Sequence, residues 1–264
     1  MIGWKPERLG SLRFGWRPLL VLLVLAGVWE LYVDLGGADP NILPPPHAVA
    51  QSLLDDRSLL WSNFLVTAEE IVLGILVAGV VAAALAVTIH FSRTLRGAVY
   101  PLLVASQTIP IPMIAPLLVL WLGFGIGEKL VVIALVSFFP IVVTTLDGLA
   151  AVDAELIKLM RTFDAPRSRV FRHVELPSAF PGLFSGAKIA VVFAVIGAVF
   201  AELSGSESGL GNLFQQSIPQ LLTARAYATV VILSAFAIAL FALLTLAERL
   251  ALPWAHRPRG GPSA

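Results

Sequence analysis

The stretch IVLGILVAGVVAAALAVTIHF, residues 71–91, contains 21 residues and no charged side chain. A transmembrane α-helix needs about 20 predominantly apolar residues to cross the hydrocarbon core of a bilayer. An uninterrupted apolar run of this length is typical of a membrane span and unusual for a helix in a soluble core. The stretch therefore predicts a membrane-spanning helix.

The composition of the whole chain also indicates a membrane protein. The 264 residues are 58% hydrophobic and 13% charged, whereas a soluble domain has roughly 25% charged residues. Such a chain could not cover a water-facing surface without large apolar patches, so a soluble enzyme and a disordered chain are excluded. The net charge of +1 gives no indication of nucleic-acid binding, and the absence of cysteine excludes thiol chemistry.

Charge-poor segments along the chain predict six spans. They cover residues 18–33, 71–91, 100–122, 130–146, 183–203 and 226–247. The third contains four prolines, so we expect an irregular middle. We expect no signal-peptide cleavage, because 17 residues precede the first apolar run and acidic residues lie just before the small-residue site at 36–38.

The basic residues predict the orientation of these spans. Fourteen of the 18 lysines and arginines fall on one side, three fall on the other, and Lys188 lies inside the fifth span. Cytoplasmic loops carry the excess of Lys and Arg, so both termini and the loop 149–182 are predicted to be cytoplasmic. The chain then divides into a cytoplasmic segment (1–17), a transmembrane domain (18–250) and a cytoplasmic tail (251–264) that we expect to be disordered.

The loop 149–182 is too long to be a simple connection. Apolar residues at helical spacing form a stripe that contains Leu156, Leu159, Met160 and Phe163. A second short helix is predicted after Asp164, ended by Pro177 and Pro181. Two interpretations remain open at this point: the loop lies on anionic lipid, or it is a docking surface for a cytoplasmic partner.

The stretch MRTFDAPRSRVFRHVELPSAFPGLFSGAKIA, residues 160–190, resembles the conserved loop of ATP-binding-cassette importer permeases. That family's pattern is Glu-Ala-Ala, three residues, Gly, nine residues, Ile, any residue, Leu-Pro. In this chain Leu176 and Pro177 match, and Val174 takes the Ile position. The chain departs from the pattern at the Gly position, which holds Asp164, and at residues 158–160, which replace Glu-Ala-Ala.

Other stretches extend the resemblance over residues 40–250. Segments similar to nitrate, sulfonate and taurine permeases are ILPPPHAV (42–49), SQTIPIPMIAPLLVLWLGFGIGEK (106–129), GAVFAEL (197–203) and SGLG (208–211). Within that group, the Ser-Gln-Thr-Ile-Pro run and the position of Glu70 resemble members that import thiamine-pyrimidine precursors or riboflavin-like compounds.

The resemblance implies an all-α membrane protein of the type I importer permease kind, with about six spans and a coupling helix in the loop between spans four and five. It implies a homodimer of permeases in the bacterial inner membrane, two cytoplasmic ATPase subunits and an external solute-binding protein. The sequence has no phosphate-binding loop with adjacent Gly and Lys, so ATP and Mg are expected on the ATPase, and no cofactor or metal is expected on this chain. The expected activity is alternating-access import of a thiamine precursor, riboflavin-like compound, sulfonate, taurine or nitrate.

On this resemblance, coupling to the ATPase is assigned to Asp164, Ala165, Arg169, Val170, Phe171, Arg172, Val174, Leu176 and Pro177. We expect Val170, Phe171 and Val174 to enter a groove of the ATPase, with Arg169 and Arg172 at its rim.

Polar side chains in or beside the spans are costly and are therefore candidates for the solute pathway. These candidates are Glu70, Gln107, Thr108 and Glu202. Structural alternatives stay open for each: an external interface position for Glu70, a polar patch between helices for Gln107 and Thr108, and a cap or ion pair for Glu202. Lys188 is expected to extend to the cytoplasmic interface.

Two other functional classes are less well supported. An intramembrane hydrolase needs a nucleophile near a base, but GSESG at residues 205–209 has Glu where the serine of a GxSxG motif would stand. A proton-coupled carrier should have acidic residues near the membrane midplane and repeated halves, and neither is evident in the sequence. The chain is therefore expected to be a transporter subunit and not an enzyme.

Overall fold

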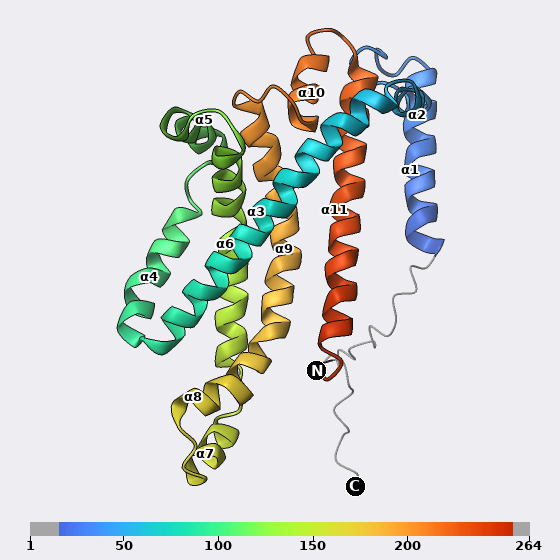
Figure 1. Ribbon diagram of the computed structural model, residues 1–264. Helices are drawn as coiled ribbons and strands as arrows, with labels where there is room; N and C mark the ends of the chain where they lie inside the picture. The colour runs from blue at the N-terminus through green and yellow to red at the C-terminus, as the bar shows by residue number, and fades with distance from the viewer. Residues whose placement is uncertain (1–15, 256–264) are drawn as a thin grey trace, which may run out of the picture.

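The computed structural model describes residues 16–255, which form eleven α-helices and one π-helical turn (Figure 1). No β-strand occurs in this part of the chain. Most of the predicted cytoplasmic segments 1–17 and 251–264 lies outside the described residues. The elements are α1 (Trp16–Asp34), α2 (Pro46–Asp55), α3 (Arg57–Phe91), α4 (Arg93–Ser106), α5 (Ile111–Leu122), α6 (Ile126–Ala150), α7 (Ala154–Thr162), α8 (Arg167–Val170), the π-helical turn η1 (Phe171–Glu175), α9 (Leu176–Leu203), α10 (Leu210–Ser217) and α11 (Thr223–Ala251).

Six membrane crossings are present in the described residues if one bent pair of helices is counted as a span. Five helical segments are long and apolar enough to cross alone: α1, α3, α6, α9 with the turns before it, and α11. Helices α4 and α5 meet at 101°. In Figure 1, α4 begins where α3 ends, and α6 begins at the opposite end of the molecule, so the bent pair is a single broken span. The predicted fold class and the irregular third span are confirmed.

The helices extend well beyond the charge-free segments that located them. Helix α3 has 35 residues, which corresponds to about 50 Å at 1.5 Å per residue. It crosses the molecule diagonally (Figure 1), as a helix longer than the bilayer core does. A charge-free run marks only the hydrocarbon part of a span, because a helix can continue through polar residues into the interface.

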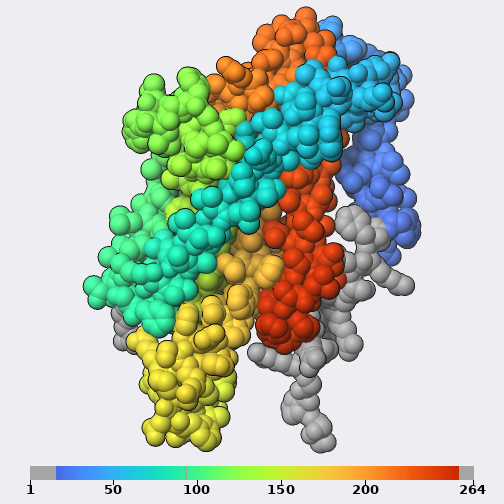
Figure 2. Space-filling view, in the orientation of Figure 1, coloured from blue at the N-terminus to red at the C-terminus, as the bar shows by residue number. Residues whose placement is uncertain are grey.

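The two ends of the molecule differ in shape. Helices α7 and α8 with η1, residues 154–175, form a knob that projects beyond the spans (yellow in Figure 2). The beginning of α1 and the end of α11 lie toward the same end as this knob, whereas α2, α5 and α10 lie at the other end (Figure 1). We call these the knob end and the α10 end.

Small residues bring α6 and α9 into close contact at the centre of the fold. A Cβ atom added at Gly186 would lie 2.7 Å from the Cα atom of Ile141 and 2.9 Å from the carbonyl oxygen of Pro140. At Gly197 it would lie 3.2 Å from the Cα atom of Ile133. Because lipid offers no hydrophobic driving force between helices, this close van der Waals packing is a main source of helix association.

Two ion pairs join the elements at the α10 end. The Arg225 guanidinium of α11 donates to both carboxylate oxygens of Asp56, at 2.9 and 2.7 Å, and these bonds lower the pKa of Asp56. Glu30 of α1 pairs with the His47 ring of α2, and this hydrogen bond raises the pKa of His47. These contacts tie α1 and α11 to α2.

Pro177 and Pro181 do not end the helix of the loop, which corrects the sequence prediction. The turn η1 leads directly into α9, and the N–H of Leu176 donates to the carbonyl of Phe171, five residues earlier. A π-helical turn widens the backbone by one residue, which makes room for the ring of Pro177 and for its missing N–H. The knob and the fifth span therefore form one continuous helical segment.

The close approach of α6 and α9 predicts the effect of enlarging Gly186. We expect Gly186→Val to lower the free energy of unfolding by about 1–3 kcal/mol, because its side chain would collide with the backbone of α6. Gly79→Val in α3 is the matched control, since nothing lies within 4 Å of a Cβ atom at Gly79. Thermal unfolding of the detergent-solubilised permease measures both, and equal losses in the two variants would contradict the packing argument.

Candidate functional site

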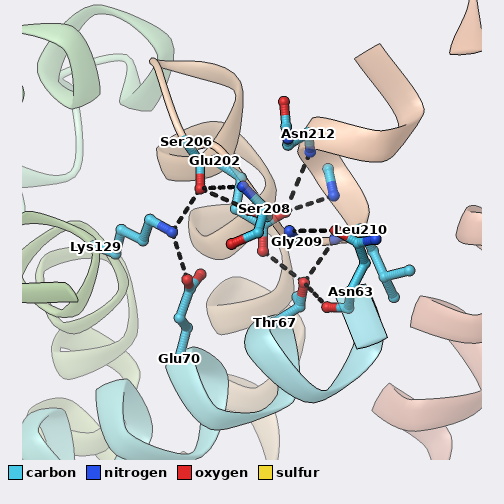
Figure 3. A network of polar contacts seen from close by, with 11 residues as sticks. Asn63, Thr67, Glu70, Lys129, Glu202, Ser206, Ser208, Gly209, Leu210 and Asn212 are labelled. Carbon is cyan, nitrogen blue, oxygen red and sulfur yellow. Dashed lines mark hydrogen bonds and ion pairs between the residues drawn. The ribbon is translucent and has the colours of Figure 1, made fainter. Parts of the chain in front are cut away.

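A cluster of buried polar residues lies at the α10 end, around the start of α10. Glu202 is buried at the end of α9, and its carboxylate accepts a hydrogen bond of 2.5 Å from the Thr67 hydroxyl (Figure 3). Its other oxygen accepts from the backbone N–H groups of Gly211 and Asn212, at 2.5 and 3.3 Å. The first N–H groups of a helix lack partners within the helix, and they favour negative charge. Glu202 therefore caps α10.

Helix α3 holds the same segment from the other side. The Asn63 amide oxygen accepts from the N–H of Gly209 at 2.8 Å, and the Thr67 hydroxyl oxygen accepts from the N–H of Leu210 at 2.8 Å. Gly209 has a φ of +112° and its backbone lies against the Glu202 carboxylate. Only glycine fits here, because a side chain would be strained and would displace the carboxylate.

A buried ion pair lies beside this cap. The Lys129 ammonium of α6 donates to Glu70 of α3 at 2.5 Å and to the Ser206 hydroxyl at 2.7 Å (Figure 3). Ser206 in turn donates to the carbonyl of Ser208 at 2.6 Å. Lysine 129 thus connects α3, α6 and the segment between α9 and α10.

A cavity of about 510 Å³ opens next to the ion pair. Its charged lining consists of Glu69, Glu70, Glu128, Lys129 and Glu207. Glu70 is only 2% exposed and Glu128 only 3% exposed. Each of these two has one carboxylate oxygen with no hydrogen-bond partner. The cavity therefore carries more negative than positive groups, and two of its carboxylates are incompletely satisfied.

The break between α4 and α5 lies deeper along α6. Gln107 lines a cavity of about 230 Å³ together with Val136 and Phe193. Thr108 is not among the lining residues, and its hydroxyl donates to the carbonyl of Ala105 at 2.7 Å. The structure thus separates the predicted pathway residues into two places: Glu70 and Glu202 at the α10 end, and Gln107 beside the broken span.

The knob shows why aspartate can stand at the family's glycine position. Asp164 has a φ of +50°, in the left-handed region that glycine adopts freely and aspartate tolerates. Its N–H donates to Arg161, and the N–H of Ala165 donates to Met160. These two bonds form a Schellman motif that ends α7. The position therefore requires a backbone conformation and not glycine itself.

Two of the apolar residues predicted to enter an ATPase groove, Val170 and Phe171, pack against this chain itself. Val170 is buried, and the Phe171 ring packs on Phe91 of α3 with 4.8 Å between centroids. The Glu175 carboxylate accepts a hydrogen bond of 3.0 Å from the His90 ring of α3. Of the other coupling candidates, Arg169 and Arg172 are exposed with Asp164, whereas Ala165, Val174, Leu176 and Pro177 are half-buried.

The exposed apolar face of the knob comes from α7 instead. It contains Leu156, Leu159 and Phe163. These residues formed the amphipathic stripe in the sequence, but they were not included among the coupling candidates. The helical spacing of these residues indicates an apolar face, but the sequence does not indicate that the face points away from the rest of the chain.

Lys188 has a partner within the protein that its sequence position did not indicate. Its ammonium pairs with Glu248 of α11 at 2.7 Å. Glu248 lies at the end of the last span, so two charges distant in sequence satisfy each other where a single charge would be costly. Lys129, one residue before the predicted fourth span (130–146), is likewise paired and is buried against Glu70.

The cap of α10 generates a stability prediction. We expect Glu202→Ala to lower the free energy of unfolding by about 1–3 kcal/mol for each buried donor it leaves unpaired. Glu202→Gln should lower the free energy of unfolding by less, because the amide oxygen of glutamine can still accept a hydrogen bond. Glu207→Ala, at an exposed carboxylate of the same segment, is the control and should leave the thermal midpoint unchanged. A Glu202→Ala midpoint equal to that of the control would contradict the cap.

Comparison with known proteins places this architecture in a family. Residues 71–253 match the model of the binding-protein-dependent transport system inner membrane component. A probable ABC transporter permease protein of Haemophilus influenzae is 37% identical, over 85% of this chain and 92% of that protein. The formylaminopyrimidine transport permease protein ThiX of Halalkalibacterium halodurans is 35% identical, over 90% of this chain and 95% of that protein.

A third relative and a solved structure agree with these. The riboflavin transport system permease protein RibX of Chloroflexus aurantiacus is 34% identical, over 92% of each chain. The crystal structure of an amino acid ABC transporter shares the fold, with a TM-score of 0.59 and 17% identity over 75% of this chain and 97% of that one. The chain therefore belongs to the binding-protein-dependent inner membrane components, as the permease subunit of an ATP-binding-cassette importer, and it is not an enzyme.

Proposed function

We propose that the cytoplasmic ATPase of this importer docks on the exposed face of the knob, formed by Leu156, Leu159 and Phe163. The observation that carries the proposal is that these three exposed apolar residues lie on the knob, which projects beyond the spans (Figure 2). An exposed apolar patch away from the bilayer indicates a protein contact. Arg169 and Arg172 are exposed on the adjoining helix and would lie at the edge of the contact.

Within this proposal, Val170, Phe171 and Val174 connect the knob to the spans of the permease instead of contacting the ATPase. Phe171 packs against the Phe91 ring, and the Arg167 guanidinium lies 5.2 Å from the centroid of the Phe91 ring. A force on the knob would pass to α3 through these contacts and to α9 through the continuous helix. Coupling requires such a two-state contact, because ATP can shift the permease only by differential interaction with its states. The motion would alternate the cavity at the α10 end between open and closed.

We further propose that the knob end is cytoplasmic, that the permease works as a homodimer, and that an external binding protein delivers the solute to the α10 end. The backbone break between α4 and α5 supports a second subunit. Gln107 and Thr108 are exposed, and Gln107 lines a cavity with Val136, which lies about 15 Å along α6 from its start. Irregular backbone at this depth is tolerated only against protein or a water-filled cavity, and a second permease would supply that cover.

The solute is proposed to be a small heterocyclic organic compound. The relatives at 35% and 34% identity are named for formylaminopyrimidine and riboflavin. Relatives named for aliphatic sulfonates and taurine are 28% identical. ATP and Mg are assigned to the partner ATPase, and lipid surrounds the remaining apolar faces.

Replacing Phe163 tests the docking proposal. We expect Phe163→Asp to reduce copurification of the cognate ATPase at least tenfold, because a carboxylate would be buried in an apolar contact. Ile42→Asp at the α10 end is the matched control, since Phe163 is 74% exposed and Ile42 is 73% exposed. Normal copurification and ATP-dependent uptake by the Phe163 variant would overturn the proposal.

Single cysteines test the orientation, because the sequence has none of its own. A membrane-impermeant maleimide added to intact spheroplasts should label Gln220→Cys at the α10 end. It should label Ala151→Cys, at the knob end of α6, only after the membrane is permeabilised. Both positions are exposed, so the reverse pattern would contradict a cytoplasmic knob.

A further inference from the structure

We propose that the acidic cavity at the α10 end receives a positively charged or amine-bearing group of the imported solute, so that the importer handles organic cations or amines and not anions. The inference rests on the proposed function for the assignment of this end as the entrance. It adds a substrate class and a site for it.

The charge of the lining is the first support. Glu69, Glu70, Glu128 and Glu207 face the cavity with one basic residue, Lys129. Lys129 is already paired with Glu70 at 2.5 Å. Three carboxylates therefore remain without a cation in the cavity. Low-dielectric walls lined by one sign of charge concentrate ligands of the opposite sign.

Unsatisfied buried oxygens are the second and independent support. Oε2 of Glu70 and Oε2 of Glu128 are inaccessible to solvent and have no hydrogen-bond donor within the described residues. Leaving a buried acceptor unpaired is costly, and more so when it is charged. Both residues line the cavity, so a rotation that turned either oxygen toward it would let a ligand N–H group pair with that oxygen. A sulfonate or nitrate would bring only acceptors and further negative charge.

The surroundings suit an organic group rather than a bare ion. Phe124 and Val66 line the same cavity, together with the small residues Gly125 and Gly205. The volume of about 510 Å³ is in the range of small-molecule sites. A planar cation could then stack on the face of the aromatic ring and also pair with a carboxylate.

The ion pair of Lys129 and Glu70 is also connected to one wall of the cavity. Ser206 and Ser208 come from the segment that Lys129 holds by a single hydrogen bond of 2.7 Å. A ligand that competes for Glu70 would weaken the grip of Lys129 on that carboxylate. Solute entry would thereby change the contacts among α3, α6 and the 204–209 segment.

Charge-selective labelling of a single cysteine tests the site in the full-length permease in lipid nanodiscs. Ser208→Cys places a thiol in the lining, and Gln215→Cys on α10 is the exposed control outside the cavity. The probes are the 2-aminoethyl and 2-sulfonatoethyl methanethiosulfonates, which have opposite charges. We expect the ratio of cationic to anionic rate constants to be at least about tenfold higher at position 208 than at position 215.

Protection by small ligands then tests recognition. 4-Aminopyridinium chloride should slow labelling at position 208, whereas sodium methanesulfonate at the same ionic strength should not. Adding Glu69→Gln and Glu128→Gln should bring the rate ratio close to that of the control and remove the protection. Val66→Cys repeats the measurement if the Ser208 variant is unstable.

Equal rate ratios at the two positions, or protection by methanesulfonate, would overturn the inference. Because labelling needs neither ATP nor the partner proteins, these outcomes are independent of coupling. A permease that shows the cation selectivity but does not assemble with an ATPase would refute the proposed docking and leave the cavity assignment intact. ATP-driven uptake of nitrate or of an alkanesulfonate without an amine would refute the cavity assignment and leave the proposed docking intact.

Discussion

Polar groups that this chain carries into the bilayer need partners from the protein, because hydrocarbon supplies none. The fold meets this constraint with pairs that are distant in sequence: Glu70 with Lys129, Lys188 with Glu248, and Glu202 with Thr67 and the start of α10. Each pair joins two different spans. The same groups that would be costly alone therefore fix which helices are neighbours, while the glycines of α6 and α9 set how close they come.

The sequence was sufficient for the number of spans and the place of the broken one, because both depend on local composition. Charge-free runs need no knowledge of neighbours, and the prolines around Gln107 interrupt a helix wherever it lies. Helix ends were less accessible, as the 35 residues of α3 show. A helix that leaves the bilayer core continues through polar residues, and no change in composition marks its true start.

The site could be predicted only in part, for the same physical reason. Glu70 and Glu202 were recognisable as charges beside spans, but their partners depend on the tertiary fold. Lys129 follows a glycine-rich turn and lies just outside the predicted fourth span, so nothing in the sequence indicated its pairing with Glu70. In the knob, a helical stripe identified Leu159 and Phe163 as one face, but only packing decides that Phe171 turns toward Phe91 while Phe163 turns outward.

Lys129 has two partners, Glu70 and Ser206, and the loss of one would cost more free energy than the loss of the other. If the hydrogen bond to Ser206 breaks, the ammonium keeps Glu70 as its counterion. If α3 separates from α6, two buried charges lose each other, which is far more costly. The bond to Ser206 is thus the weaker of the two contacts of Lys129, and Asn63 of α3 still holds Gly209 at the end of the same segment. Helices α3 and α6 therefore stay joined by their ion pair even where the contact with Ser206 is lost.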